Sequence, residues 1–202
     1  MIQSHPEEND PAPEPETSEG LGRFLEQNRA RLRRMVELRL DRRVRGRVDA
    51  SDVLQEAFIE VSTRVPQYLE KPDVPFYVWV RFITAQKIQE FHRRHLGRQN
   101  RDVRREVRLG TAPEASSIAL AEAFLDDGPS PSQVAMEQEN WRRLLNALEG
   151  LKPVDREVVA MRHFEGLRNV DVAEILGLSK PGASVRYVRA MQRLGAALQE
   201  AS

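Results

Sequence analysis

The stretch GLRNVDVAEILGLSKPGASVRYVRAMQRL, residues 166–194, decides the fold of the C-terminal part of this 202-residue chain. A helix-turn-helix needs a small residue where its two helices cross and a tight turn four residues later. Ala173 and Gly177 stand in these two places, and glycine suits the turn because it tolerates positive φ. The spacing therefore predicts two helices that meet at Gly177.

The residues around this turn favour the same motif. Ser179 can cap the second helix, and Pro181 is tolerated in the first turn of a helix. Together with Ala173 and Gly177 they give the local signals of a helix-turn-helix. Apolar residues flank the crossing point on the side that would be buried, namely Val172, Leu176, Leu178 and Ala183.

The second helix of this pair is basic on its outer side. Residues 177–202 contain four Lys or Arg side chains against Glu200 alone. Arginine grips phosphate and pairs with guanine in the major groove, which favours a DNA-recognition helix. The alternative is a plain helical hairpin with a solvated basic face. The helix would project Ser184, Arg186, Arg189 and Arg193, with Lys180 at its start.

Charge along the whole chain is sorted into blocks, although 31 basic and 31 acidic side chains cancel overall. Residues 1–22 hold six acids and no Lys or Arg, whereas residues 23–110 hold 21 bases and 12 acids. Residues 111–140 again hold six acids and no base, and residues 141–202 hold 10 bases and 7 acids. This pattern indicates two polyanion-binding domains, an acidic tail and an acidic linker.

Periodicity predicts an all-α protein, because no segment has the alternation of a strand. We expect two small helical domains, at residues 21–98 and 134–202, joined by a flexible acidic linker at 99–133. Residues 1–20 are predicted to be a disordered acidic N-terminal extension, since they are nearly free of large apolar side chains. Pro66, Pro72 and Pro75 are expected to bracket a loop, PQYLEKPDVP.

Composition also excludes several classes of protein. There is no cysteine, which rules out disulfides and thiolate metal sites. No apolar run approaches the ~18 residues that a membrane-spanning helix needs, and the N-terminus lacks the features of a signal peptide. We therefore expect a cytoplasmic protein with no membrane insertion.

The stretch DVLQEAFIEV, residues 52–61, is predicted to form a helix with an acidic polar side. Asp49 and Ser51 are candidates for its N-cap, and Asp52, Gln55 and Glu56 form a stripe away from the apolar residues. Acids on a basic domain are poor partners for DNA but good partners for a basic protein surface. These acidic side chains can also stabilise the helix by interacting with the partial positive charge at its N-terminal end. Docking on a protein and stabilising the helix are roles that can coexist.

Three stretches in this order resemble bacterial RNA polymerase sigma factors of the extracytoplasmic-function type. They are VDASDVLQEAFIEV (48–61), PFYVWVRFITAQKIQEFHRR (75–94) and GLRNVDVAEILGLSKPGASVRYVRA (166–190). The resemblance covers residues 21–98 as sigma region 2 and residues 134–197 as sigma region 4. It implies an alternative sigma factor that directs promoter recognition and DNA opening.

The resemblance also implies partners. Asp52, Gln55 and Glu56 would dock on the clamp coiled coil of the largest subunit of core RNA polymerase. Promoter DNA is the second implied partner, and an anti-sigma factor is a further candidate. The recognition helix would read a −35-type element, although its KPGASVR start departs from the VGTVKSR-like pattern of common members. The implied −35 contacts are Lys180, Ser184, Arg186 and Arg189.

The helix at 75–94 and the loop before it are implied to bind the promoter element nearest the start site and to capture a flipped base. Tyr68 is the one aromatic of that loop and could stack on a base. Trp79 lies in a dense apolar set, which favours core packing over stacking. The implied −10 contacts are Tyr68, Arg81, Lys87, His92, Arg93 and Arg94.

Two other functions compete with this interpretation. A stand-alone helix-turn-helix transcriptional regulator explains the C-terminus but leaves the basic N-terminal domain and its acidic stripe unused. An enzyme acting on nucleic acid could use His92 and His95, at i and i+3, to hold a metal. No acid lies at a matching spacing, and the chain has no Gly-rich phosphate loop or nucleophile motif. We therefore expect no enzyme activity, no metal and no cofactor.

Overall fold

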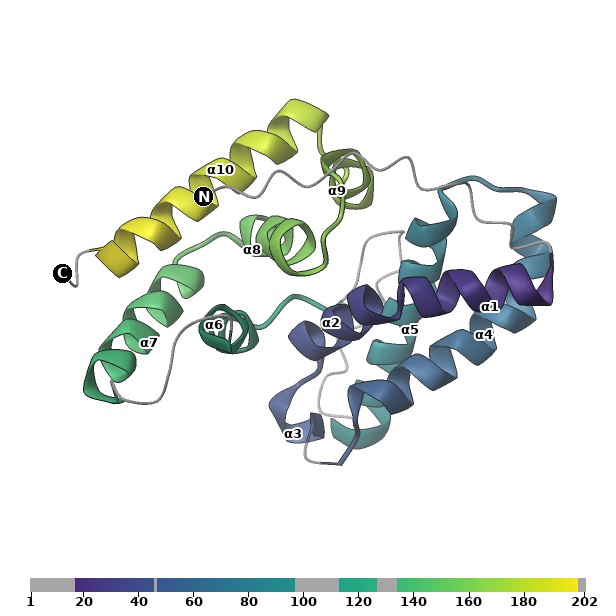
Figure 1. Cartoon of the computed structure of the whole chain (residues 1–202), viewed down its shortest axis with the longest axis horizontal. Helices are drawn as coiled ribbons and strands as arrows, with labels where there is room; N and C mark the ends of the chain where they lie inside the picture. Colours follow the sequence, from purple (N-terminus) through teal and green to yellow (C-terminus); the bar gives the residue numbers. More distant parts are fainter. Residues whose placement is uncertain (1–16, 46, 97–112, 127–133, 200–202) are drawn as a thin grey trace.

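The computed structural model describes residues 17–45, 47–96, 113–126 and 134–199, and every regular element in these ranges is helical (Figure 1). This confirms the expected all-α class. The expected N-terminal extension lies outside the described residues up to residue 16, but residues 18–20 already belong to the first helix. The helices of the first half are α1 (Ser18–Gln27), α2 (Arg29–Arg39), α3 (Arg42–Arg45), α4 (Ala50–Glu70) and α5 (Phe76–Leu96). Those of the second half are α6 (Ser117–Asp126), α7 (Val134–Glu149), α8 (Pro153–Val159), the π-helical segment η2 (Ala160–Phe164), α9 (Asn169–Leu176) and α10 (Lys180–Gln199).

The N-terminal domain is built around apolar stripes on α2, α4 and α5. Each stripe follows from residues three or four apart falling on one face of a helix. Burying a large aliphatic side chain stabilises a fold by about 1.5–3 kcal/mol, so this core can support a domain of its own. Its most buried members are Leu32, Met35, Val36, Val53, Leu54, Val61, Val80, Ile83 and Ile88.

The start of α4 confirms the predicted N-cap. The Asp49 side chain accepts a hydrogen bond from the backbone N–H of Ser51 at 2.7 Å. In return, the backbone N–H of Asp49 donates to the Asp52 carboxylate at 3.1 Å, which completes a capping box. Asp52 therefore has a structural role at this helix start.

The loop expected between Pro66 and Pro75 is shorter than predicted. Helix α4 continues through Pro66 to Glu70, and the connection to α5 contains only residues 71–75. Pro66 removes one backbone donor from the helix, but it lies on the exposed side of α4, where water can bind the carbonyl left without its partner. The loop prediction is wrong at its start, because a proline on the exposed side of a helix costs too little stability to end that helix.

The C-terminal domain contains the predicted helix-turn-helix. Helix α9 ends at Gly177, whose φ of 63° is left-handed, and α10 begins three residues later. The hydroxyl of Ser179 accepts the backbone N–H of Gly182 at 3.1 Å, as expected for a cap. Ala173 and Ala183 are buried where the two helices meet. The small residue, the turn and the cap therefore stand where the sequence placed them.

The region expected to be a flexible linker contains a packed helix. Leu120 of α6 is fully buried in a cluster with Leu144 and Leu148 of α7. Just before α6, the backbone N–H of Ser116 donates to the carbonyl of Leu38 in α2 at 2.9 Å, so this segment lies between the two domains (Figure 1). Residues Ser117–Asp126, with the apolar sequence SIALAEAFLD, are therefore a packed helix within the linker and not a flexible spacer, while most other linker residues lie outside the described ranges.

Changing Gly177 to Ala should destabilise the helix-turn-helix, because a left-handed φ costs a non-glycine residue about 1–2 kcal/mol. No atom crowds a Cβ at this position, so the effect comes from the backbone alone. Gly195 of α10 is the matched control, since it is helical and equally uncrowded. Gly195→Ala should raise stability by up to about 1 kcal/mol. Thermal unfolding followed by circular dichroism should show a lower melting temperature for Gly177→Ala and a higher one for Gly195→Ala. Equal shifts of the melting temperature in the two variants would contradict the assignment of the turn.

Candidate functional site

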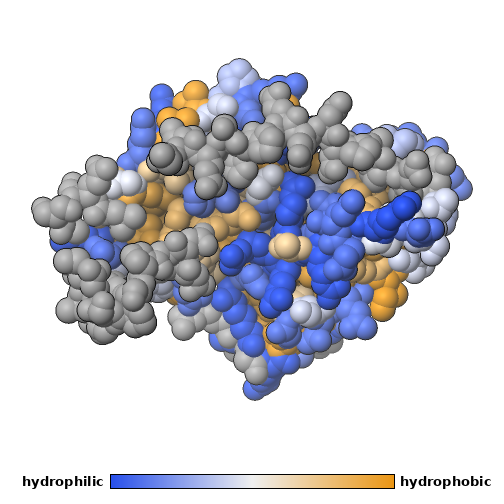
Figure 2. Space-filling model, viewed as in Figure 1, coloured by the Kyte–Doolittle hydropathy of each residue, from blue (hydrophilic) through white to orange (hydrophobic). Residues whose placement is uncertain are grey.

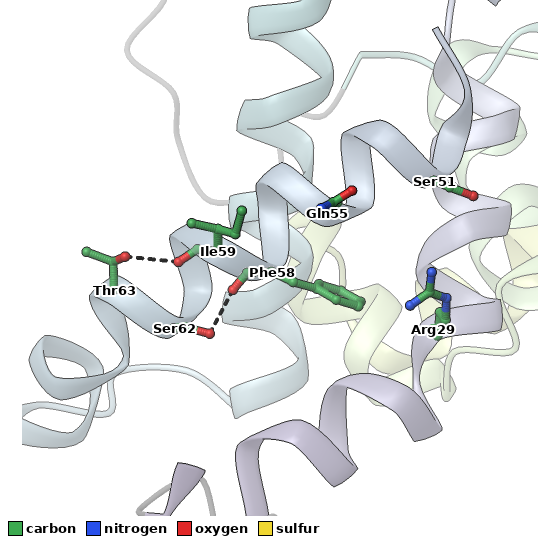
Figure 3. A pocket seen from close by; sticks show the side chains of 7 residues that line it. All are labelled: Arg29, Ser51, Gln55, Phe58, Ile59, Ser62 and Thr63. Carbon is green, nitrogen blue, oxygen red and sulfur yellow. Dashed lines mark hydrogen bonds between the residues drawn. The ribbon is translucent and has the colours of Figure 1, made fainter. Parts of the chain in front are cut away.

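The outer face of α4 borders an open hollow of about 580 Å³ (Figure 3). Gln55 and Ile59 lie one turn apart on this face, and Arg29 of α2 lines the opposite side. Ile59 is 61% exposed, which is unusual for so large an apolar side chain. The hollow therefore combines an exposed apolar contact with an amide that can form hydrogen bonds. Its remaining lining residues are Ser51, Phe58, Ser62 and Thr63.

The two acids predicted for this surface are engaged within the protein. Asp52 accepts the backbone N–H of Asp49 in the capping box. Glu56 forms an ion pair with Arg94 of α5, with its two carboxylate oxygens 3.0 and 3.2 Å from one guanidinium nitrogen. Gln55 is the member of the predicted stripe whose side chain lies in the open hollow. The face is thus less acidic than its sequence suggested.

Tyr68 is part of an aromatic cluster at the end of α4. Its ring centroid lies 5.1 Å from that of Phe76 and 4.9 Å from that of Trp79. Its hydroxyl donates to the carbonyl of Val74 at 2.7 Å, and partial burial raises the pKa of the phenol. Trp79 packs against the core, in agreement with the interpretation from sequence. Tyr68 itself is partly buried against the same core.

Arg81 is placed away from the other predicted −10 residues. Its side chain is 3% exposed, and its Nε lies 3.1 Å from the carboxylate of Glu165 in the C-terminal domain. A guanidinium buried in this way cannot contact DNA in the present arrangement. The structure therefore separates Arg81 from the other predicted contacts of this helix.

Lys87 and His92 are held by neighbours within the N-terminal domain. The Lys87 ammonium lies 3.0 Å from Glu60 and 3.1 Å from Glu90. The Nε2 atom of His92 accepts the backbone N–H of Asp41 at 3.0 Å, which requires the neutral imidazole. Burial lowers the pKa of His92 and so favours that neutral form.

The last turn of α5 carries two exposed arginines. Arg93 and Arg94 are both exposed there, and Arg94 also lies 5.2 Å above the ring of Phe91. Hydrophilic residues cover most of the surface around α1–α5 on the face shown in Figure 2. Of the predicted −10 contacts, these two arginines are the most accessible to a phosphate backbone.

The recognition helix α10 presents three of its four predicted contacts to solvent. Ser184 and Arg189 are exposed on the helix, and Lys180 is exposed at its first residue. Arg186 instead points toward the domain, where its guanidinium lies 2.7 Å from the carboxylate of Asp155 in α8. In this state Arg186 helps to hold α10 on α8.

Sequence reasoning missed two valines on the same side of α10. Val185 is 46% exposed and Val188 is 51% exposed, next to Ser184 and Arg189. The signal was available, because both valines lie off the stripe of Ala183, Ala190 and Leu194 that the helix buries. Apolar side chains on a recognition helix can contact the methyl group of thymine in the major groove.

The described part of the chain shows neither a metal-ligand cluster nor a membrane-spanning helix. It contains no group of three or more His, Cys, Asp or Glu side chains that could hold a metal ion. Among its helices none is both long and apolar enough to cross a membrane.

Comparison with protein families gives two matches in chain order. The model for Sigma-70 region 2 matches residues 25–98, and the model for Sigma-70, region 4, matches residues 141–194. The first match covers α2, α4 and α5, and the second covers the helix-turn-helix. Together they span both domains and leave α6 and its flanking residues unmatched.

Curated relatives carry related names. The chain is 32% identical over 141 residues to the probable RNA polymerase sigma factor RfaY of Xanthomonas campestris, covering 70% of this chain and 32% of that protein. It is 31% identical to the ECF RNA polymerase sigma factor SigD of Mycobacterium tuberculosis, and the match covers 74% of this chain and 63% of SigD. It is 27% identical to the RNA polymerase sigma factor CnrH of Cupriavidus metallidurans, covering 74% and 73%. The match thus spans about a third of RfaY and under two thirds of SigD.

A solved structure shares the fold. It is the structure of CnrH in complex with the cytosolic domain of CnrY, with a TM-score of 0.52 and 20% identity over 92% of each chain. At this identity the likeness concerns the fold alone.

Protonation of His92 should weaken the N-terminal domain. Folding lowers the pKa of His92, so the folded protein favours the neutral ring. The resulting stabilisation is complete above the usual pKa of 6.5 and is lost as the pH falls through the lower pKa of the folded state. Asp41 and Arg43 face the ring, and Arg43 holds the pKa of Asp41 at about 2, so neither titrates between pH 5 and 7. Urea unfolding at pH 7 and at pH 5 measures this effect. From the higher to the lower pH, the free energy of unfolding of wild type should fall by under about 1 kcal/mol more than that of His92→Gln. An equal pH dependence in both proteins would contradict this role.

Proposed function

Because this chain belongs to the sigma-70 family, as a sigma factor of the extracytoplasmic-function type, we propose that it binds core RNA polymerase and directs promoter recognition and DNA opening. The observation that carries the proposal is the presence of regions 2 and 4 in one chain and in this order. We place this activity in the cytoplasm and expect no enzyme activity of its own. An anti-sigma factor remains a candidate partner.

The outer face of α4 is the proposed docking surface for core polymerase. Gln55 supplies hydrogen bonds at its centre, and Ile59 supplies an apolar contact that would be buried on binding. The ion pair with Arg94 partly neutralises Glu56, which keeps open acceptor sites because its side chain is 38% exposed. Asp52 acts mainly by fixing the start of the helix. The docking surface is therefore centred one turn further along α4 than the acidic residues suggested.

The proposed −10 surface lies at the end of α5. Arg93 is exposed on the last turn and can bind a phosphate, and Arg94 can bind another if it exchanges its ion pair with Glu56 for the phosphate. Tyr68 belongs to an aromatic cluster that could stack an extruded base, which offsets the few kcal/mol that unstacking costs. Lys87 and His92 act through the packing of the domain.

The proposed −35 surface is the exposed side of α10. Arg189 binds the backbone or guanine and Ser184 adds a polar contact, while Lys180 at the start of the helix binds a phosphate. Val185 and Val188 lie on the same side and supply apolar contacts to bases. The ion pair of Arg186 with Asp155 sets the orientation of the helix on its domain.

Run-off transcription with bacterial core polymerase tests the function and the docking surface together. Wild-type protein should produce promoter-specific transcripts that core polymerase alone does not give. A Gln55→Ala, Ile59→Ala double variant should reduce the affinity for core polymerase at least tenfold, because it removes the central contacts. The measurement is the half-saturating concentration, with direct binding to core polymerase as a second assay.

The matched control is Gln67→Ala, an exposed amide three turns further along the same helix. It should leave direct binding to core polymerase unchanged, and circular dichroism should show an intact helical fold for both variants. Tight, specific binding to duplex DNA without any response to core polymerase would instead favour a stand-alone helix-turn-helix regulator. Unchanged polymerase binding by the double variant would reject the docking surface but not the function.

Val188 should discriminate thymine by its methyl group. In a duplex selected for binding from a random pool, replacing the contacted thymine with uracil removes one methyl and should weaken binding about fourfold. In Val188→Ala the same replacement should have little further effect, because the partner of that methyl is gone. Fluorescence anisotropy at fixed salt measures the affinity of wild type and of Val188→Ala for the thymine duplex and for the uracil duplex. Equal sensitivity of wild type and variant at every thymine would contradict this contact.

A further inference from the structure

A series of ion pairs crosses the surface between α4 and α5. The two helices run antiparallel, so Glu56 lies opposite Arg94, and Glu60 lies opposite Lys87. We call the whole set the ion-pair ladder. Acidic and basic members are equal in number, so the ladder has no net charge. Its members are Glu56, Glu60 and Arg64 of α4, and Lys87, Glu90 and Arg94 of α5.

The ion-pair ladder lies between the two surfaces proposed for the N-terminal domain. Glu56 follows Gln55 in α4 and lies one turn before Ile59, so it borders the docking surface. Arg94 follows Arg93 in the last turn of α5 and belongs to the −10 surface. The pair of Glu56 and Arg94, which we call the outermost pair, therefore joins a residue of one surface to a residue of the other.

The ion-pair ladder is held more tightly at its centre than at its outer end. The ammonium of Lys87 lies 3.0 Å from the carboxylate of Glu60 and 3.1 Å from that of Glu90, and its side chain is 12% exposed. In the outermost pair, the side chain of Arg94 is 52% exposed and that of Glu56 is 38% exposed. Water screens an exposed ion pair and lowers the cost of separating it. The outermost pair therefore exchanges partners more easily than the inner one.

The geometry of the outermost pair also favours exchange for a phosphate. Both carboxylate oxygens of Glu56 approach the same guanidinium nitrogen of Arg94, at 3.0 and 3.2 Å. A guanidinium binds an anion most strongly when two of its nitrogens contact two oxygens in parallel. A second nitrogen of Arg94 lies 3.6 Å from Glu90, which is longer than a hydrogen bond. A phosphate can therefore occupy the parallel geometry that Glu56 does not use.

Arg94 can keep its place on α5 when it changes partner. Its guanidinium lies 5.2 Å above the ring of Phe91, which is buried in the core of the domain. This cation–π contact holds one face of the guanidinium and leaves its edge to an anion. Glu90 is closer to Lys87 than to Arg94, so it competes weakly for an arginine that Glu56 has released. A released Arg94 is therefore already positioned at the −10 surface.

A basic partner on the docking surface competes with Arg94 for the Glu56 carboxylate. Glu56 is partly exposed beside Gln55, so a cation of core polymerase that approaches this surface can reach its oxygens. Attraction to a second cation weakens the hold of Glu56 on Arg94. A phosphate that binds Arg94 acts in the reverse direction, because it leaves the carboxylate to the polymerase. Since both ligands break the same ion pair, each raises the affinity of the protein for the other.

We propose that Glu56 couples polymerase docking to DNA binding by exchange of the outermost ion pair. In the free protein Glu56 holds Arg94, and each side chain masks the charge of the other. A basic surface of core polymerase takes Glu56 and releases Arg94 to a phosphate of the −10 segment. Glu56 therefore acts on DNA through Arg94, as a positioning residue. This proposal rests on the sigma-factor function proposed above and adds a link between two of its surfaces.

Binding of the free protein to single-stranded DNA measures the hold of Glu56 on Arg94. A fluorescent oligomer of about 12 thymidines at low, fixed salt is a suitable probe, since phosphate contacts carry no sequence information. Glu56→Gln should tighten binding about threefold, because it releases Arg94. In an Arg94→Gln background the same change should have no effect, because no arginine is left to release. Equal tightening in both backgrounds would be a general effect of charge and would overturn the proposal.

Binding to core polymerase tests the same exchange from the other side. Arg94→Gln should raise the affinity for core polymerase about threefold, because the Glu56 charge is no longer partly neutralised. In a Glu56→Gln background the same change should leave this affinity unaltered. If the ion pair only stabilised the packing of α4 on α5, Arg94→Gln would instead lower the affinity. Unchanged or lower affinity of a folded Arg94→Gln variant would overturn the proposal.

Glu70→Gln is the matched control for the change of charge. Glu70 is an exposed acid at the C-terminal end of α4, about four turns from Glu56. Its replacement should change DNA binding equally with and without Arg94. A dependence of its effect on Arg94 would show that the coupling does not belong to Glu56. Glu56 and Arg94 are both partly exposed, so neither variant removes a core side chain, and circular dichroism checks the fold of each.

Failure of this proposal can be distinguished from failure of the function. If wild type directs transcription but Glu56 and Arg94 act independently in both binding assays, the function stands and the coupling does not. If wild type neither binds core polymerase nor directs transcription, the function fails and the coupling fails with it. If each change has its effect only while the other side chain is present, in both assays, the ion pair links the two surfaces.

Discussion

The carboxylate of Glu165, held between Arg39 and Arg81, fixes how the two halves of this protein are arranged. Apolar contacts also join the halves, because Leu38 of α2 and Val78 of α5 belong to clusters made mostly of C-terminal residues. A carboxylate buried at the end of a helix, however, needs positive charge close to it. Since that charge comes from the N-terminal domain, the closed arrangement follows from this requirement. The same contact decides which arginines are free to bind DNA.

The sequence predicted the parts of the fold that depend on neighbours in the chain. Gly177, Ser179 and Asp49 each act on backbone groups within a few residues, so local spacing was sufficient to place them. Pro66 shows the limit of local reasoning. Whether a proline ends a helix depends on whether the carbonyl left without a partner can reach water, and this requires knowing which side of α4 is exposed.

The candidate site was harder to predict, because the partner of a charge is decided by the tertiary fold. Arg81 is 84 residues from Glu165 in sequence, and Glu56 is 38 residues from Arg94. On a helical wheel these four residues look like free polar positions. Packing instead commits them to one another, while Gln55 and Ile59 remain open beside the hollow on α4. Charged residues are therefore the weakest part of a site prediction from sequence, since they are the residues most able to pair internally.

Internal pairing also changes the meaning of the charge blocks. The basic excess of residues 23–110 appears large, but Arg39 and Arg81 are neutralised by acids of the second domain. Breaking those pairs would return positive charge to the N-terminal domain and negative charge to the C-terminal domain. Because phosphate binding depends on the number of available cations, an open protein would bind polyanions more strongly than a closed one of the same composition. Conformation, and not composition alone, thus sets the affinity of this chain for nucleic acid.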